Sequence, residues 1–219
     1  MELTVPTKPV KPAVMLPLFQ RLANSFTDLA TENMAKYDHH ISCRKGCGAC
    51  CRQPVPLAEI EIYHIAHVVE QLSEPRQSEV RKNFEHAVAH FREMGWFEEM
   101  ENCEDEEEMK QIASKYFKEG VACPFLDEES CSIHNDRPVA CREFLVTSPW
   151  EHCADPSVLP VAQLPLPVNA SDGLRKLGRT EKLGKRNFLP LVRALEWTKQ
   201  YPENFKERTG EEWLAEFFL

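Results

Sequence analysis

The stretch CRKGCGACC, residues 43 to 51, constrains this chain more than any other feature. It places four sulfur atoms within nine residues, and its two glycines make a regular helix unfavourable there. A second group of cysteines lies far downstream, between residues 123 and 153. The two groups together contain Cys43, Cys47, Cys50, Cys51, Cys123, Cys131, Cys141 and Cys153. We predict that the chain folds back to bring these eight sulfurs together.

The length of the chain and its cysteine content favour metal or redox chemistry. A chain of 219 residues can bury its own hydrophobic core without disulfide support. The N-terminus lacks a cationic start followed by an apolar run, and no segment approaches the roughly 20 apolar residues of a membrane span. We therefore expect a cytoplasmic protein with no membrane contact. Because cytosolic thiols are kept reduced, nine cysteines favour metal ligation or redox chemistry over disulfides.

The charge of the chain is acidic overall and uneven along its length. The net charge is −9, and residues 98 to 108 contain eight carboxylates in eleven positions. This balance argues against a general nucleic-acid binder, so we expect no DNA partner. The ninth cysteine, Cys103, lies inside the acidic run, where neighbouring carboxylates disfavour a thiolate. We therefore leave Cys103 out of the candidate ligand set.

A basic segment, residues 175 to 186, has six cationic side chains in twelve positions. They are Arg175, Lys176, Arg179, Lys182, Lys185 and Arg186. One interpretation is a solvated basic surface. The other is an anion-binding patch for a phosphate, a nucleotide or an acidic protein partner.

Apolar residues recur at helical spacing through most of the chain. This period predicts helices over residues 16–37, 57–72 and about 75–94, and a further helix that follows the acidic run and stops at Gly120. Two final helices are expected at about 188–200 and 210–217, the last with a capping box between Thr209 and Glu212. Strand signals are nearly absent. We therefore predict a mainly α fold, an irregular helical domain with long metal-binding loops.

Three segments are expected within this architecture. Residues 1–15 contain several prolines and are predicted to form an extended N-terminal arm. Residues 16–155 form the helical domain with the cysteine cluster. Residues 156–219 contain a proline-rich wrapping segment, the basic segment and the C-terminal helices, which we expect to pack on the same domain.

The chemistry of sulfur narrows the choice of metal. Thiolates are soft ligands, and an all-sulfur tetrahedral site is typical of zinc or of an iron–sulfur cluster. Eight cysteines could supply two four-sulfur sites, or one iron–sulfur cluster with the other thiols acting in redox chemistry or on a second metal. Adjacent cysteines such as Cys50 and Cys51 usually point in different directions. They could therefore serve different metals.

Positive side chains accompany the cysteines along the sequence. Four thiolates around Zn²⁺ or a [4Fe–4S]²⁺ core give a formal charge of about −2, which calls for nearby cations. The cationic residues within four positions of a candidate ligand are Arg44, Lys45, Arg52, Arg137 and Arg142. Each could also form an ordinary salt bridge. His134 is a candidate for a hydrogen bond to the centre or for ligation, and a packed or solvated role is its alternative.

The spacing CxxxCxxC of Cys43, Cys47 and Cys50 also occurs in radical S-adenosylmethionine enzymes. Those enzymes need a largely parallel β/α barrel, whose alternating strands this sequence does not show. The full pattern, with CPFL, CSIHNDRPVACR and a last cysteine, resembles instead the YkgJ-type CxxxCxxCC family of zinc- or iron-chelating proteins. Flagellin lysine N-methylase also belongs to that family. The resemblance covers roughly residues 40–153 and implies a metal or iron–sulfur centre held by the eight cysteines.

Three functions agree with these features. The first is a metal-binding protein whose iron–sulfur cluster, or zinc as the less favoured metal, serves a redox role or supports a protein partner. The second is an S-adenosylmethionine-dependent protein lysine N-methyltransferase, which only the resemblance implies and for which the sequence assigns no catalytic residue. The third is a thiol–disulfide switch that cycles without a permanent metal.

Overall fold

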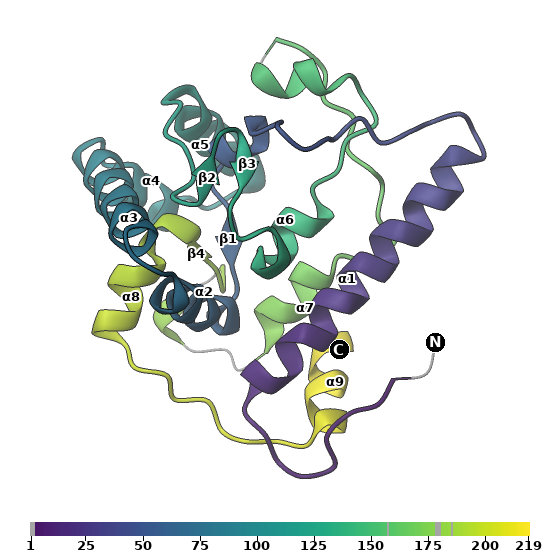
Figure 1. Cartoon of the computed structure of the whole chain (residues 1–219), viewed down its shortest axis with the longest axis vertical. Helices are drawn as coiled ribbons and strands as arrows, with labels where there is room; N and C mark the ends of the chain where they lie inside the picture. The colour runs from purple at the N-terminus through teal and green to yellow at the C-terminus, as the bar shows by residue number, and fades with distance from the viewer. Residues whose placement is uncertain (1–2, 157, 178–180, 185) are drawn as a thin grey trace.

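Helices joined by long loops make up the computed structural model, which describes residues 3–156, 158–177, 181–184 and 186–219 (Figure 1). The helices are α1 (Pro12–Ala35), α2 (Glu59–Gln71), α3 (Arg76–Glu93), α4 (Trp96–Asn102), α5 (Glu106–Lys118), α6 (Val139–Glu143), α7 (Ala170–Lys176), α8 (Ala194–Gln200) and α9 (Gly210–Phe218). Two short antiparallel pairs join β1 (Pro56–Leu57) to β4 (Leu189–Pro190) and β2 (Leu126–Asp127) to β3 (Ser130–Cys131). The predicted mainly helical fold with long loops is confirmed.

The first helix begins earlier than the sequence indicated. α1 starts at Pro12 instead of the predicted residue 16, so the last residues of the predicted arm are helical. Proline suits the first turn of a helix, because its missing N–H would have no partner there and its φ is already helical. The rest of the arm is tied to the chain around α9. Val10 N donates to Arg208 O (2.8 Å), and Gly210 N donates to Pro6 O (2.8 Å).

The acidic run contains a helix that the sequence did not predict. α4 starts after Gly95, whose φ of +70° separates it from α3. It buries Trp96 and Met100 while its glutamates face outward. α5 follows, with the Asp105 side chain as its N-terminal cap, and it stops before Gly120 as predicted. The carboxylates of residues 98–108 therefore lie on the short link between α4 and α5 and on the solvent-exposed faces of these two helices, whose apolar faces pack into the core.

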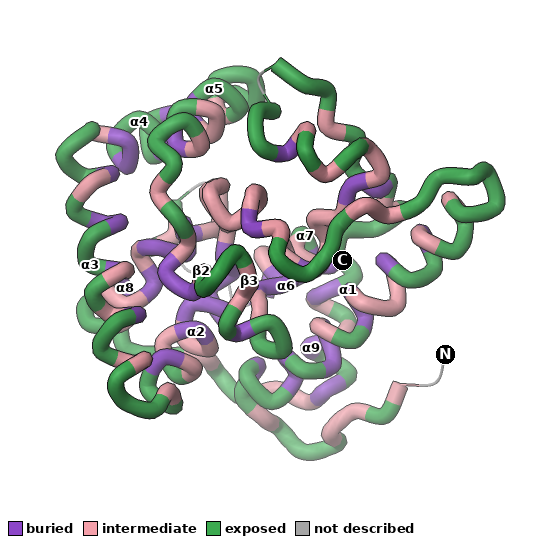
Figure 2. The backbone as a smooth tube through the Cα atoms, turned by 45° about the horizontal axis from the view of Figure 1, so that its top comes forward, coloured by how far each residue is buried: buried purple, intermediate pink, exposed green. Residues whose placement is uncertain are grey.

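The core consists of three clusters of buried side chains that share helices. The first lies between α1, α7 and α9, the second between α2, α3 and α8, and the third between α3, α4 and α5. α2 joins the first two clusters through Ile60 and Ile62, and α3 joins the last two through Phe84 and Phe91. Buried, intermediate and exposed residues alternate along the helices, and the long loops contain residues of all three classes (Figure 2). None of the described helices has the length and apolar composition needed to cross a membrane.

Backbone hydrogen bonds join three long loops that connect the helices. They follow α1, α5 and α6 and span residues 36–58, 119–138 and 144–169. Cys123 N donates to Cys51 O (2.7 Å), which joins the first loop to the second. Ser42 N donates to Val146 O (3.0 Å), which joins the first loop to the third. The candidate cysteines lie on or beside this junction.

Candidate metal centre

The cysteine loop, residues 43–51, is shaped by its two glycines. Gly46 has a φ of +83°, in the left-handed region that other residues avoid. Gly48 lies against the β2–β3 hairpin, where an added Cβ would be only 2.9 Å from Leu126 Cδ1. The loop then closes in the short 3-10 turn Ala49–Arg52. These glycines therefore let the loop turn tightly and approach the hairpin that contains a downstream cysteine.

The downstream cysteines come from separate elements around the cysteine loop. Cys123 lies before β2, Cys131 ends β3, Cys141 lies on α6, and Cys153 lies on a 3-10 turn beyond α6. The backbone hydrogen bond from Cys123 to Cys51 fixes one side of this arrangement. The chain thus folds back as predicted.

The thiols form two groups, here called neighbourhoods, whose members act on one another electrostatically. Both neighbourhoods include Cys50. The first contains Cys50, Cys51, Cys123, Cys131 and Cys141, and the second contains Cys43, Cys47, Cys50 and Cys153. Burial raises the pKa of Cys141 well above its ordinary value and that of Cys153 to about 11. The charges of the neighbouring thiolates raise both pKa values further. Without a cation, most of these thiols therefore stay protonated.

The adjacent thiols Cys50 and Cys51 interact directly. A hydrogen bond between them lowers the pKa of Cys50 and raises the pKa of Cys51, and burial also raises the latter. The hypothesis that the two thiols serve different metals stays a prediction. In the free thiol form negative charge is favoured at Cys50, and metal binding must displace protons from the buried thiols around it.

The donor set fits an all-sulfur metal centre by its chemistry. All nine cysteines are free thiols. Cys123 and Cys131 pack against the second core cluster, which shields them from water. Among the described residues, no group of three or more Cys, His, Asp or Glu side chains is already placed to hold a metal ion. Sulfur ligands of this kind suit zinc and iron–sulfur clusters, and their final arrangement is coupled to metal binding.

Two of the predicted arginines supply positive charge beside the thiols. Burial raises the pKa of Cys131, and a backbone hydrogen bond together with the charges of Arg137 and Arg142 partly offsets that rise. Arg142 is only 7% exposed. Its side chain donates to Arg137 O (3.0 Å) and to Asn135 O. Arg142 is therefore a fixed cation next to the centre.

The other two predicted arginines fasten the cysteine loop instead. Arg52 forms a two-bond ion pair with Glu129 (2.7 and 2.9 Å), which ties the loop to the β2–β3 hairpin. Arg44 lies over the ring of Trp150, 4.2 Å from its centroid, which ties the loop to the turn that contains the last cysteine. His134 is exposed and lines a neighbouring pocket.

Glu61 is a structural residue of the site that sequence reasoning missed. It is only 2% exposed, and its carboxylate accepts hydrogen bonds from Val139 N (2.7 Å) and Ala58 N (3.1 Å). It thereby fixes the start of α6, which contains Cys141, to the start of α2. The sequence signal was a glutamate in the first turn of a helix, which is common on exposed helices and does not by itself indicate burial.

The described side chains of the basic segment contact different parts of the chain. Lys176 lies in the last turn of α7, whereas Arg179 and Lys185 lie outside the described residues. Three other members have partners within the chain. These partners are Asp172 for Arg175, the Tyr201 ring for Lys182 (5.0 Å) and Cys103 O for Arg186 (2.8 Å). The anion-binding patch stays a prediction.

The fold and the site define a helical protein organised around a cysteine-rich centre for metal chelation. The model of the CxxCxxCC family, described as a putative zinc- or iron-chelating domain, matches residues 42–158, just over half of the chain. The chain belongs to this family, and the predicted resemblance is confirmed. The matched region includes all eight candidate ligands and ends before α7. Neither a curated protein nor a solved structure matches the chain.

Proposed function

We propose that this protein holds an iron–sulfur cluster between the cysteine loop and the downstream cysteines, and that it serves a redox role for a protein partner. The observation that supports this most strongly is the overlap of the two thiol neighbourhoods at Cys50. All-thiolate donor sets of this kind hold iron–sulfur clusters. Such a cluster, when bound, supplies one-electron redox chemistry.

Three features favour an iron–sulfur cluster over zinc. Val146 N donates to Cys43 Sγ (3.4 Å), and hydrogen bonds to ligand sulfurs adjust the reduction potential of such clusters. Cys43 is exposed, so an electron partner can approach this edge of the centre. Arg137 and Arg142 place positive charge beside the sulfurs, which stabilises the more negative reduced state. Zinc has no redox chemistry for these features to adjust.

The proposed location is the cytoplasm. Nine free cysteines, several of them partly exposed, are most stable in a compartment where thiols are kept reduced. The exposed edge at Cys43 is the proposed side for the redox partner.

The contact between Cys50 and Cys51 favours a second candidate, a thiol–disulfide switch. The hydrogen bond from Cys51 stabilises the Cys50 thiolate, which is the form that attacks a disulfide. Attack on a disulfide oxidant would release one thiolate and form a mixed disulfide. Attack by Cys51 would then release the second thiolate and join the two neighbouring sulfurs. The methyltransferase hypothesis stays a prediction from resemblance alone.

Metal analysis and a visible absorption spectrum on one anaerobically purified sample test the proposal. We expect iron, acid-labile sulfide and a broad absorption band near ~400 nm. A colourless protein with stoichiometric zinc would contradict the iron–sulfur proposal. A metal-free protein whose Cys50 and Cys51 oxidise reversibly would favour the thiol switch.

A further inference from the structure

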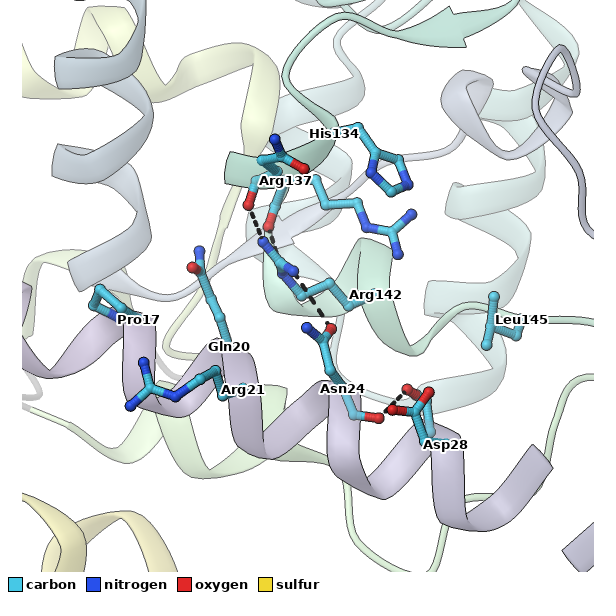
Figure 3. A pocket seen from close by; sticks show the side chains of 11 residues that line it. Pro17, Gln20, Arg21, Asn24, Asp28, His134, Arg137, Arg142 and Leu145 are labelled. Atoms are coloured by element: carbon cyan, nitrogen blue, oxygen red, sulfur yellow. Dashed lines mark hydrogen bonds between the residues drawn. The ribbon is translucent and has the colours of Figure 1, made fainter. Parts of the chain in front are cut away.

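A polar pocket lies between α1 and the segment 134–145, and no cysteine lines it (Figure 3). Its volume of about 600 Å³ is within the range of roughly 300–1,000 Å³ that small-molecule sites occupy. Three arginines line the pocket, Arg21 from α1 and Arg137 and Arg142 from the opposite wall. Asp28 is its one acidic lining residue among those described. The pocket is therefore cationic, although the chain as a whole is acidic.

Arg142 is held in place by neutral oxygens from both walls of the pocket. It donates to Arg137 O (3.0 Å), to Asn135 O and, across the pocket, to Asn24 Oδ1 (3.4 Å). These bonds orient the guanidinium group, and no described carboxylate forms an ion pair with it, although Asp136 and Glu61 act on its charge from further away. A preoriented guanidinium loses little conformational freedom when it binds an anion.

Arg137 has an unmet hydrogen-bonding requirement in the same wall. Its Nε is buried and has no hydrogen-bond partner among the described residues. Within the part of the chain that the structure describes, none of Arg21, Arg137 and Arg142 forms an ion pair with a carboxylate. Two neighbouring guanidinium groups also repel each other, which an anion between them would relieve.

We infer that this pocket binds a small organic anion, with a carboxylate or phosphate group held by Arg137 and Arg142. The planar guanidinium group can bind either anion through two parallel hydrogen bonds. Gln20 and Asn24 from α1 supply amide groups for the rest of the molecule, and Arg21 supplies a further cation at its edge. The inference does not depend on which metal the cysteines hold.

Calorimetric titration of the metal-loaded full chain tests this inference. Inorganic phosphate and succinate are titrated separately at constant ionic strength, and we expect saturable binding of at least one, which identifies the preferred anionic group. Arg137→Gln and Arg21→Gln should each weaken that binding at least about tenfold, because each removes a charged donor. Arg142→Gln is avoided because its three hydrogen bonds also support the fold.

The matched control is Arg175→Gln, which removes one positive charge from the basic segment outside the pocket. We expect it to bind the anion as the unmodified protein does. Equal weakening in the control and in the pocket variants would mean a general charge effect and would overturn the inference. Absence of saturable binding for both probes would overturn it as well. If Arg137→Gln loses metal, Arg21→Gln decides the outcome, since Arg21 lies on α1 away from the cysteine loop.

Discussion

Cys50→Ser and Cys123→Ser are each expected to lower the bound metal at least about tenfold and to lower the temperature of unfolding. Serine keeps the size of the side chain but cannot supply a thiolate at neutral pH. The free energy of metal binding to thiolate sites is also folding free energy, about 10–16 kcal/mol for structural zinc, so loss of metal and loss of stability should occur together. Metal analysis and thermal unfolding followed by circular dichroism measure both effects.

The two positions test different parts of the centre. Cys50 is the thiol common to both neighbourhoods, so its loss should affect every metal that the cysteines hold. Cys123 belongs to the first neighbourhood, and its backbone N–H already joins the two loops through Cys51 O (2.7 Å). Full metal retention in both variants would refute a shared centre.

Cys103→Ser is the matched control for these substitutions. Cys103 is buried, but its sulfur contacts Asp105 O (3.2 Å) and Arg186 (3.1 Å) instead of another cysteine. A serine hydroxyl can donate to Asp105 O in the same way, so we expect full metal content. A comparable loss of metal in this variant would mean that any buried serine destabilises the chain.

The helices could be predicted from the sequence where their signals are local. The capping box between Thr209 and Glu212 forms as predicted, with Thr209 N donating to Glu212 Oε2 (2.7 Å). Gly120 ends α5 for the reason that its φ of +65° is easily reached only by glycine. α4 was missed because eight carboxylates dominate residues 98 to 108, and the apolar face beneath them is only two turns long.

The sequence allowed the residue types of the site to be predicted, but not their arrangement in space. The eight cysteines and their spacing indicated thiolate ligands for a metal, but they left open whether the sulfurs form one site or two. Which arginine faces the sulfurs depends on long-range packing: Arg52 is paired with Glu129, 77 residues away, whereas Arg142 on α6 donates to Asn24 on α1, 118 residues away. The pocket beside Arg137 likewise depends on the position of α1 and has no local sequence signal.

Glu61→Gln is expected to change how the stability of the protein depends on pH. Burial raises the pKa of Glu61 from its ordinary value of 4.5 to about 7, although hydrogen bonds from Val139 and Ala58 oppose the rise. Between these two pH values the folded protein binds more protons than the unfolded chain. The stabilisation is therefore fully present below pH 4.5 and is lost as the pH rises through 7, a change of about 3 kcal/mol. Glutamine cannot ionise, so the variant should lack this loss.

Urea unfolding of the two proteins at matched metal content, between pH 5 and pH 8, measures the difference. Glutamine keeps an oxygen for Val139 N but leaves Ala58 N without its acceptor, which adds a constant cost of about 1–3 kcal/mol at every pH. The quantity that tests the prediction is therefore how the difference in the free energy of unfolding between the two proteins changes with pH. A difference that stays constant from pH 5 to pH 8 would contradict a buried Glu61 that titrates in this range.

Glu212→Gln is the control for Glu61→Gln, because Glu212 occupies the same position in the first turn of α9. Glu212 is exposed, and hydrogen bonds from Thr209 lower its pKa. Its contribution to stability has the opposite sign: it is present above the ordinary pKa of 4.5 and is lost as the pH falls below it. Glu212→Gln should therefore leave the profile between pH 5 and pH 8 unchanged in shape. The two glutamates occupy the same helix position and differ in burial. A pH profile that changes with Glu61→Gln and not with Glu212→Gln would therefore assign the pH dependence to the burial of Glu61.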